Sequence, residues 1–392
     1  MREVVCPVTH SYHSSEDVLA ELAPLVEFLE SDRAAAEQTV FPRGVVTPDG
    51  RLDLCKQSIG IEGCARLTEA LKHNRKIGAI LFGTDGIGSE GARHVAGLIA
   101  ENDTLETVYL GCNDIESDGV AALAGALGEN RTVRGLWLKR NPIGVDGAKS
   151  LAAMLRVNRT LEILDLVNTV PGPEGLAALL DVLIGENRTL RKLYLSGNGL
   201  DAADAERLKT LLIENDALDT LMLSVNHLGD AGVRTLAAGL GHNKTLRTLS
   251  LASNGISASG AAALLESLPE DTALEYLDLG YAISTRVLNA QNNALGDEIA
   301  PAVRDFLKRN RTLRQLEMIN TGLTGVGLDA IFEGVLENPV LSRLRVNGRL
   351  PERVLSRLKA NGEKSAVVVS PGVRAIKSVY RTARKTADSA AV

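Results

Sequence analysis

The sequence contains few aromatic residues and few cysteines. Aromatic residues make up 3% of its 392 residues, and it contains only four cysteines. The cysteines are unevenly spaced, which argues against the disulfide framework of a small secreted domain. No run of 18 apolar residues occurs, so no membrane span is predicted. The first residues lack the apolar stretch of a signal peptide, and we therefore expect a cytoplasmic protein.

Motifs for catalysis and for cofactors are also scarce. No Gly-x-x-x-x-Gly-Lys-Ser/Thr phosphate-binding loop occurs. Residues 86–91 match a dinucleotide-binding fingerprint, but the same glycines recur in other copies of the repeat described below. Cys6, His10 and His13 form only a weak candidate metal set near the N-terminus. We expect neither a cofactor nor a metal.

What the chain has in abundance is an internal repeat. The pattern Leu-x-x-Leu-x-Leu-x-x-Asn-x-Ile/Leu, followed by Gly-x-x-Gly-Ala and a helical stretch, occurs eleven times. Most copies are 28 residues apart, one interval is 29 and one is 39. A fixed period of this size predicts a solenoid, in which each unit buries its apolar face against its neighbours. The asparagine position is held in turn by Gln57, Asp85, Asn113, Asn141, Thr169, Asn198, Asn226, Asn254, Asn293, Thr321 and Arg349.

Each unit predicts a short strand, a turn and a helix. The alternating leucines place one strand face in the core, so Leu138, Leu166 and Leu223 should be fully buried. The asparagine after the strand should bond to backbone groups in the turn, and these bonds should continue as a ladder. A second set of asparagines is expected to end the helices in the left-handed conformation, namely Asn130, Asn158, Asn187, Asn243 and Asn310.

These residues resemble the leucine-rich repeat family, and specifically its ribonuclease-inhibitor type. The likeness is clearest at Leu136-Trp137-Leu138, at residues 141–144, 147–148 and 158–161, and it covers roughly residues 49–362. The resemblance implies an α/β solenoid of about eleven repeats, curved as a horseshoe with parallel strands on the concave face and helices on the convex face. It also implies macromolecular recognition. It extends to a GTPase-activating protein of this repeat class and to receptor arms, but no functional residue of either can be transferred.

The pattern divides the chain into three parts. We expect an N-terminal helical cap over residues 1–45, the solenoid over residues 46–362 and a C-terminal cap or basic tail helix over residues 363–392. Inside the caps the sequence predicts helices over 15–38, over 351–360 and from Ser370 onward, with a strand over 366–369. The longest interval predicts an insertion near residues 281–291, at the rim of the concave face, which is either functional or simply tolerated.

Charge is unevenly distributed along the chain. Residues 340–392 hold twelve Lys/Arg and three Asp/Glu, a net charge of +9, and the whole chain is −6, so residues 1–339 carry −15. The acidic body disfavours nucleic acid, whereas the basic end suits an acidic partner, a membrane surface or head-to-tail self-association. In the last predicted helix, Ile376 and Tyr380 should pack on the C-terminal edge of the solenoid, with Arg374 and Lys377 in solvent.

The only tryptophan and four of the six tyrosines lie on, or at the edge of, the face formed by repeat positions three, five and seven, whose side chains should point into the concave face. Aromatics there favour partner binding, although they also fit strands and stack along a sheet. We expect Tyr109, Trp137 and Tyr194 to be anchors, with Trp137 facing away from the core. The full set of candidate partner-binding residues is Tyr109, Trp137, Lys139, Arg140, Asp165, Lys192, Tyr194, Tyr276, Asp278, Tyr281 and Glu317.

Two functions from different classes remain open. The first is an intracellular scaffold that recognises a protein or peptide partner on the concave face. The alternative is an enzyme or small-molecule binder near the 281–291 insertion, where perturbed pKa values would be expected at four residues, Tyr276, Asp278, Tyr281 and Glu317. The lack of a recognisable nucleophile–base pair or metal set counts against the enzyme.

Overall fold

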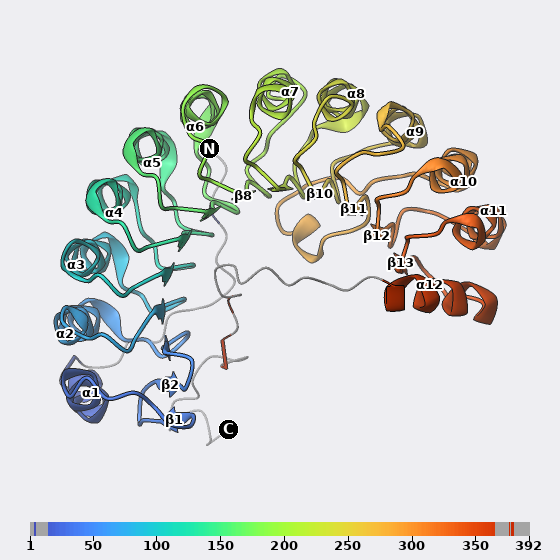
Figure 1. Cartoon of the computed structure of the whole chain (residues 1–392). Helices are drawn as coiled ribbons and strands as arrows, with labels where there is room; N and C mark the ends of the chain where they lie inside the picture. The colour runs from blue at the N-terminus through green and yellow to red at the C-terminus, as the bar shows by residue number, and fades with distance from the viewer. Residues whose placement is uncertain (1–3, 5–14, 365–375, 377, 380–392) are drawn as a thin grey trace. The chain divides into compact units, whose positions relative to one another are not determined.

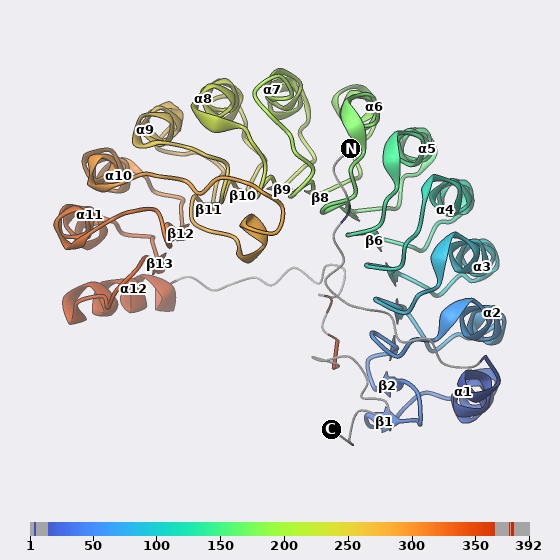
Figure 2. The ribbon, with the colours of Figure 1, turned by 180° about the vertical axis from the view of Figure 1, so that it is seen from behind.

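The computed structural model describes residue 4, residues 15–364 and residues 376, 378 and 379. The chain folds as two compact units, the first made of residues 1–182 with 371–392 and the second of residues 183–370. In each unit, strands line one side and helices cover the other (Figure 1, Figure 2). This is the strand–helix alternation that the repeat predicts.

The sheet of the first unit begins with three strands in antiparallel order and continues as a parallel sheet. The last residues of its parallel strands, Asp53, Leu81, Tyr109, Trp137 and Asp165, stand in register with one another. Its helices are α1 (Ser15–Glu30), α2 (Gly60–Leu71), α3 (Gly88–Glu101), α4 (Ser117–Glu129) and α5 (Gly144–Val157), and α6 (Gly172–Gly185) crosses the boundary between the units. Its strands are β1 (Thr39–Val40), β2 (Val45–Thr47), β3 (Arg51–Asp53), β4 (Ala79–Leu81), β5 (Thr107–Tyr109), β6 (Gly135–Trp137) and β7 (Ile163–Asp165).

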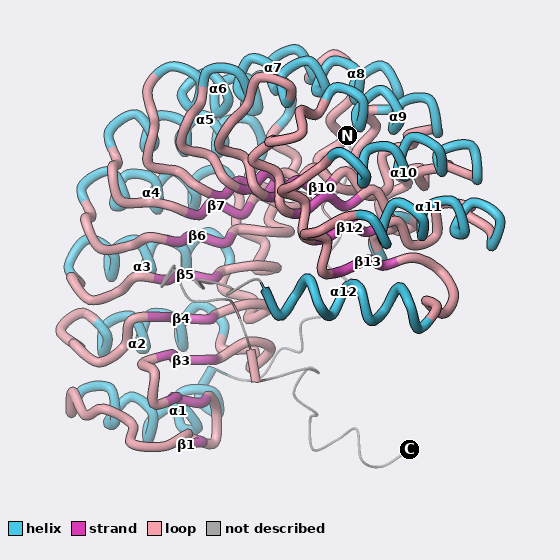
Figure 3. Tube along the Cα trace, turned by 45° about the vertical axis from the view of Figure 1, so that its right-hand side comes forward, coloured by secondary structure: helices cyan, strands magenta, loops and turns pink. Residues whose placement is uncertain are grey.

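The second unit is a parallel sheet throughout, and its strands pair in chain order (Figure 3). Two short 3-10 helices, η1 (Ile283–Thr285) and η2 (Asp297–Ile299), follow β11. The α-helices are α7 (Ala205–Glu214), α8 (Gly229–Leu240), α9 (Ala258–Ser267), α10 (Ala300–Arg309), α11 (Gly325–Glu337) and α12 (Glu352–Lys364). The strands are β8 (Lys192–Tyr194), β9 (Thr220–Met222), β10 (Thr248–Ser250), β11 (Tyr276–Asp278), β12 (Gln315–Glu317) and β13 (Arg343–Arg345).

The core of each unit lies between its strands and its helices. Leu138, Leu166 and Leu223 each have 0% exposed surface, which confirms the predicted register of the repeat. Glycines allow neighbouring helices to approach closely. A Cβ atom on Gly119, for example, would lie 2.8 Å from Cα of Ser89 in the preceding helix.

The asparagine ladder after the strands is also present as predicted. Asn113 Oδ1 accepts the backbone N–H of Asp85 at 2.8 Å, and Asn141 Oδ1 accepts that of Asn113 at 2.9 Å. The Asn113 side-chain amide donates in turn to the carbonyl of Leu110 at 3.0 Å. Each repeat thus completes the turn of the one before it, which satisfies backbone groups that no strand or helix could reach.

The asparagines at the helix ends behave differently from the prediction. Asn158 follows α5 with φ −72° and ψ 132°, which is extended rather than left-handed. Its Oδ1 accepts the backbone N–H groups of Thr160 at 2.8 Å and Leu161 at 2.7 Å, and its amide donates to the carbonyl of Leu127 at 2.7 Å. The Asn158 side chain therefore bonds backbone groups of the following turn and a carbonyl at the end of the preceding helix α4, without a left-handed backbone at Asn158.

The caps agree with the prediction in part. Helix α1 begins at Ser15 as predicted but ends at Glu30, eight residues before the expected position 38. Helix α12 covers the predicted 351–360 and extends to Lys364. The predicted strand over 366–369 and most of the last predicted helix lie outside the described residues, and Ile376, Ser378 and Val379 are not helical.

Candidate binding surfaces

Eight of the predicted binding residues lie in strands, at positions that alternate with fully buried aliphatic residues, and we call this side of each sheet the sheet face. Lys139, Arg140 and Tyr281 lie just after strands. In the first unit these residues are Tyr109, Trp137, Lys139, Arg140 and Asp165. In the second unit they are Lys192, Tyr194, Tyr276, Asp278, Tyr281 and Glu317. Tyr109 and Trp137 stand in register on neighbouring strands of the first unit, and the third predicted anchor, Tyr194, belongs to the second unit.

Tyr109 is held across the backbone of the neighbouring repeats. A Cβ atom on Gly83 would overlap the Tyr109 ring, and one on Gly111 would lie 3.0 Å from the Tyr109 hydroxyl. The Lys139 ammonium lies 5.3 Å from the centre of the ring, within the range of a cation–π contact. Burial raises the pKa of Tyr109, so the phenol stays neutral and can donate a hydrogen bond to a partner.

Trp137 is more enclosed than the sequence suggested. Its side chain is 8% exposed, although the strand pattern turns it away from the helices. Trp137 stands in register between Tyr109 and Asp165, so their side chains are neighbours across adjacent strands. Asp165 is itself 7% exposed, and burial raises the pKa of Asp165 to about 6. The hydrogen bond from the Val167 N–H and the positive charges of Lys139 and Arg140 act in the opposite direction and lower this pKa.

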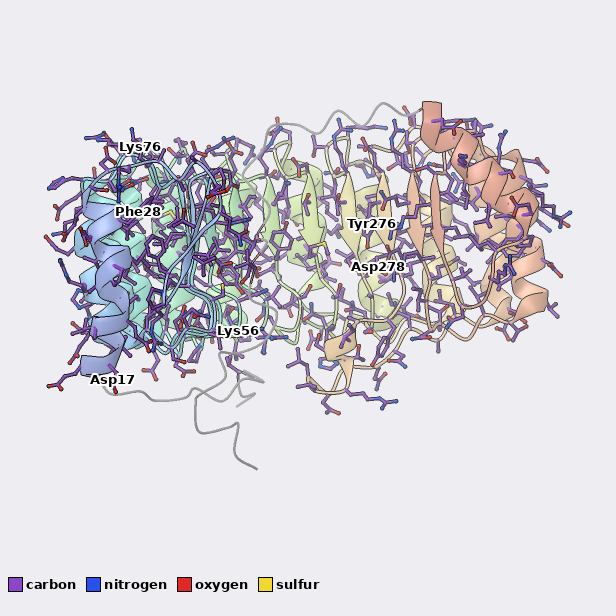
Figure 4. The ribbon with its side chains drawn as sticks, turned by 90° about the horizontal axis from the view of Figure 1, so that it is seen from below. Asp17, Phe28, Lys56, Lys76, Tyr276 and Asp278 are labelled. Carbon is purple, nitrogen blue, oxygen red and sulfur yellow. The ribbon has the colours of Figure 1, made fainter. Side chains whose placement is uncertain are left out.

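The second unit presents a row of linked polar side chains around Asp278, which lies with Tyr276 on β11 (Figure 4). Ser250 Oγ donates to Asp278 Oδ2 at 2.8 Å, and the Gly280 N–H donates to Oδ1 at 2.9 Å. Ser250 also bonds Ser224, with 2.5 Å between the two Oγ atoms. Burial raises the pKa of Asp278, while the Gly280 and Ser250 bonds act against that rise.

A charged pair lies beside this row. Arg345 donates to Glu317 Oε2 at 2.9 Å, and Glu317 stands in register with Asp278. The sequence hypothesis did not include Ser224, Ser250 and Arg345 among the site residues. Their repeat positions, five and seven, were the signal that could have identified them.

The insertion is located where the repeat interval predicts it. Asn293 Oδ1 accepts the backbone N–H of Asn254 at 2.9 Å, so Asn293 is the ladder residue and the extra residues precede it. The insertion is anchored through Thr285, which is 1% exposed and donates to Ser253 Oγ at 2.7 Å. Ile283 and Val287 are 93% and 60% exposed, so two aliphatic side chains near the candidate residues face solvent.

A further contact on the sheet face of the first unit involves the C-terminal residues. Ile376 packs against the cluster of Cys55, Ala79 and Leu81, together with Tyr109. The expectation that Ile376 covers the C-terminal edge of the solenoid is therefore wrong. The contact joins residues more than 260 positions apart in the chain, so the repeat pattern carried no sign of it.

Other expectations concern metal ligands and membranes. Cys6, His10 and His13 lie outside the described residues. Among the residues that are described, no group of three or more His, Cys, Asp or Glu is arranged to hold a metal ion. Within the same part of the chain, no helix is long and apolar enough to cross a membrane.

The repeat pattern, the parallel strands and the two asparagine ladders point to one family. A family model described as Leucine Rich repeat matches residues 101–124, 186–209 and 242–265. The chain is a leucine-rich repeat protein. Its fold is the strand–helix solenoid of that family, and the helix in each repeat is what the ribonuclease-inhibitor type implies.

Similarity to individual proteins is partial. Tropomodulin-4 of Mus musculus is 41% identical to this leucine-rich repeat protein over 54 residues, which are 14% of the chain and 16% of tropomodulin-4. Tropomodulin-4 of Homo sapiens matches to the same extent, so the chain spans less than a fifth of these relatives. Among solved structures, the yeast Rad7 and Elc1 complex is similar at 16% identity and a TM-score of 0.44, covering 70% of each chain. Leiomodin-1 actin-binding site 2 is similar at 18% identity and a TM-score of 0.32, covering 47% of this chain and 88% of that one.

Proposed function

We propose that this leucine-rich repeat protein is an intracellular binding scaffold that recognises a protein or peptide on its sheet face, in the cytoplasm. The observation that carries the proposal is the presence of large aromatic and acidic side chains on the side of the strands that faces away from the core. The core is built from aliphatic residues between strands and helices, yet Tyr109, Trp137 and Asp165 stand on the opposite side of the strands. Aromatic rings held by neighbouring residues lose little entropy on binding and often dominate interfaces.

The two units offer a partner different chemistry. In the first unit, Tyr109 and Trp137 lie beside the cations Lys139 and Arg140, which suits an apolar side chain next to an acidic group. In the second unit, Asp278 and Glu317 lie beside Tyr276, which suits basic or hydroxyl groups of a partner. The acidic body and basic end also make self-association a possible use of the same surfaces.

The enzyme alternative has weaker support. Burial raises the pKa values of both Tyr276 and Asp278, as that alternative requires. However, both oxygens of Asp278 already accept hydrogen bonds from Ser250 and Gly280, and Glu317 is paired with Arg345. Carboxylates that already accept such hydrogen bonds stabilise the local structure, and they are less available to transfer protons to a substrate.

Affinity capture from native cells, followed by titration of the recovered partner, tests the proposal. Tyr194→Ala and Tyr276→Ala should each weaken partner binding by about tenfold or more if they are anchors. Val326→Ala is the control, because Val326 is 78% exposed on α11, on the helical side. Unchanged binding of every partner by both tyrosine variants, with circular dichroism showing intact folds, would reject the sheet face of the second unit as the binding surface.

A further inference from the structure

A buried carboxylate on the first sheet face is bonded by the C-terminal residues. Asp53 is 0% exposed at the end of β3. Its Oδ2 accepts the backbone N–H of Val379 at 2.6 Å, and its Oδ1 accepts the Ser378 hydroxyl at 3.2 Å. Oδ1 also accepts the N–H of Cys55 at 3.1 Å, which fixes the orientation of the carboxylate from within the repeat.

An apolar patch lies next to this carboxylate and is covered by the same residues. Cys55, Ala79 and Leu81 form a cluster on the sheet face, and Ile376 packs against it beside Tyr109. Ile376 and Ser378 are two positions apart and both contact the surface, whereas the Val379 side chain is 38% exposed. That alternation is typical of an extended peptide laid on a surface.

The carboxylate and the patch together can recognise three features of such a peptide. The patch accepts an aliphatic side chain, Asp53 Oδ1 accepts a hydroxyl two positions later, and Asp53 Oδ2 accepts the next backbone N–H. A buried carboxylate is costly without such donors, and the apolar patch is costly when exposed to water. The surface is therefore more stable when a peptide of this kind covers it.

We propose that Asp53, Cys55, Ala79, Leu81 and Tyr109 form a peptide-binding site for an extended segment in which serine or threonine stands two positions after an aliphatic residue. The occupant is this chain's own C-terminal segment, through Ile376, Ser378 and Val379, until a partner with such a segment displaces it. The second half of the proposal rests on the proposed scaffold function. The first half, occupation by the chain itself, stands on the contacts alone.

Occupation by the same chain has a consequence for affinity. A segment tethered to its own site acts at an effective concentration in the millimolar range, so a free peptide must compete with it. The apparent affinity for a partner equals the intrinsic affinity multiplied by the fraction of molecules in which the site is open. Release of the C-terminal segment would then control access to this part of the sheet face.

Cys55 provides a reporter of occupation in the full-length chain. Its side chain is 5% exposed and is part of the cluster that Ile376 covers, so release of the segment should expose the thiol to a maleimide reagent. Cys64 is 0% exposed in α2 and reports on unfolding of the repeat itself. The labelling rate of each cysteine is followed separately by mass spectrometry of the digested protein.

Three variants test the contacts in turn. Ile376→Asp removes the apolar contact, and Val379→Pro removes the N–H donor, whereas Val379→Ala keeps that donor and is the matched control. Ile376→Asp and Val379→Pro should each speed Cys55 labelling about tenfold, the effect of losing one hydrogen bond to a charged group or a comparable contact. Val379→Ala should label at the wild-type rate, and Cys64 should stay at its wild-type rate in all three variants.

Three outcomes would overturn occupation by the same chain. The first is an unchanged Cys55 rate in both Ile376→Asp and Val379→Pro. The second is an equal rise at Cys64 in both, which would mean that the segment supports the fold and is not exchangeable. A Cys55 rate that depends on protein concentration would show binding between copies and would overturn the intramolecular form.

A peptide with the sequence of residues 374–381 tests the peptide-binding half. Carrying a fluorophore, it should bind the Val379→Pro chain about tenfold more tightly than the wild type, because the site is open there. The same peptide with Asp in place of Ile should not bind either chain. Equal binding to both chains would overturn the inference while leaving the scaffold proposal intact, since that proposal depends on the Tyr194 and Tyr276 variants.

Discussion

Single residues in the asparagine ladder have unequal consequences for stability, and Asp85 is the clearest case. Its Oδ1 accepts the backbone N–H groups of Gln57 and Ser58, each at 2.9 Å, as an asparagine would. Its Oδ2 is buried and has no hydrogen-bond partner among the described residues. In the next repeat, Asn113 has an amide nitrogen at the position that corresponds to Asp85 Oδ2, and this nitrogen donates to the backbone carbonyls of Phe82 and Leu110. A carboxylate can donate there only when protonated, and burial raises the pKa of Asp85 well above its usual range.

Asp85→Asn should therefore stabilise the protein, by roughly 1–3 kcal/mol for a buried polar group that gains its partner. Because the folded-state pKa of Asp85 is raised, the protonated form favours folding fully below the unfolded pKa of about 4, and this contribution is lost as pH rises through the folded pKa. The advantage of Asp85→Asn over wild type should consequently grow with pH. Urea unfolding of both proteins at several pH values measures it.

The reciprocal change serves as the control for this prediction. Asn113→Asp should introduce the same defect and lower the free energy of unfolding, again more strongly at higher pH. If Asp85→Asn gains no stability, or if its advantage shrinks as pH rises, Asp85 is ionised and satisfied in the folded protein.

Trp137 is buried as well as being a proposed binding residue, and two substitutions test its contribution to stability. Because its side chain is only 8% exposed, Trp137→Ala should lower the free energy of unfolding by roughly 2–4 kcal/mol, contrary to the sequence expectation of little effect. Trp137→Phe keeps most of the packing and should cost less. Denaturant melts of the two variants check this order, and a neutral Trp137→Ala would place the ring in solvent.

Among the elements, the N-terminal cap depends on one buried charge. Arg43 is 1% exposed, and its guanidinium donates to Glu21 of α1 at 2.7 Å. The same group donates to the backbone carbonyls of Gln57 and Ser58 in the first turn of the solenoid. One side chain thereby joins the cap helix to the first repeat, whose apolar edge would otherwise meet water.

Arg43→Ala should cost roughly 3–5 kcal/mol, because it leaves carbonyl groups and a carboxylate without their donor. Glu21→Gln should cost less, since the guanidinium keeps its two carbonyl partners and Glu21 is itself partly exposed. Thermal unfolding of both variants measures the difference. Equal losses in the two variants would mean that the ion pair, and not the link to the first turn, holds the cap.

The repeat elements could be predicted from the sequence because each is defined by contacts close along the chain. The burial of Leu138 and the ladder role of Asn113 follow from a pattern repeated every 28 residues. The role of Arg43 could not be predicted, because nothing in its neighbourhood marks a buried arginine. The candidate surface was predicted as a set of positions, but the bonds from Ser250 to Asp278 depend on side-chain conformations that a pattern does not contain.

The charge of the whole molecule bears on how the C-terminal segment reaches its site. Residues 340–392 carry twelve basic and three acidic residues, while the chain as a whole has a net charge of −6. A basic segment near an acidic body is attracted over distances longer than any single contact. Such attraction is screened by salt, with a Debye length of about 10 Å at 0.1 M and about 3 Å at 1 M ionic strength. The packing of Ile376 on Leu81 lacks this dependence, because it buries apolar surface.

Raising the ionic strength from about 0.1 M to about 1 M should therefore speed Cys55 labelling in the wild type, while Cys64 stays unchanged. A variant with Arg374, Lys377 and Arg381 replaced by Gln should label faster than wild type at low salt and respond less to added salt. Ile376→Asp should label fast at both salt concentrations, because its apolar contact is already lost. If salt leaves the wild-type Cys55 rate unchanged, the local contacts of Asp53 and Ile376 hold the segment without help from the charge of the chain.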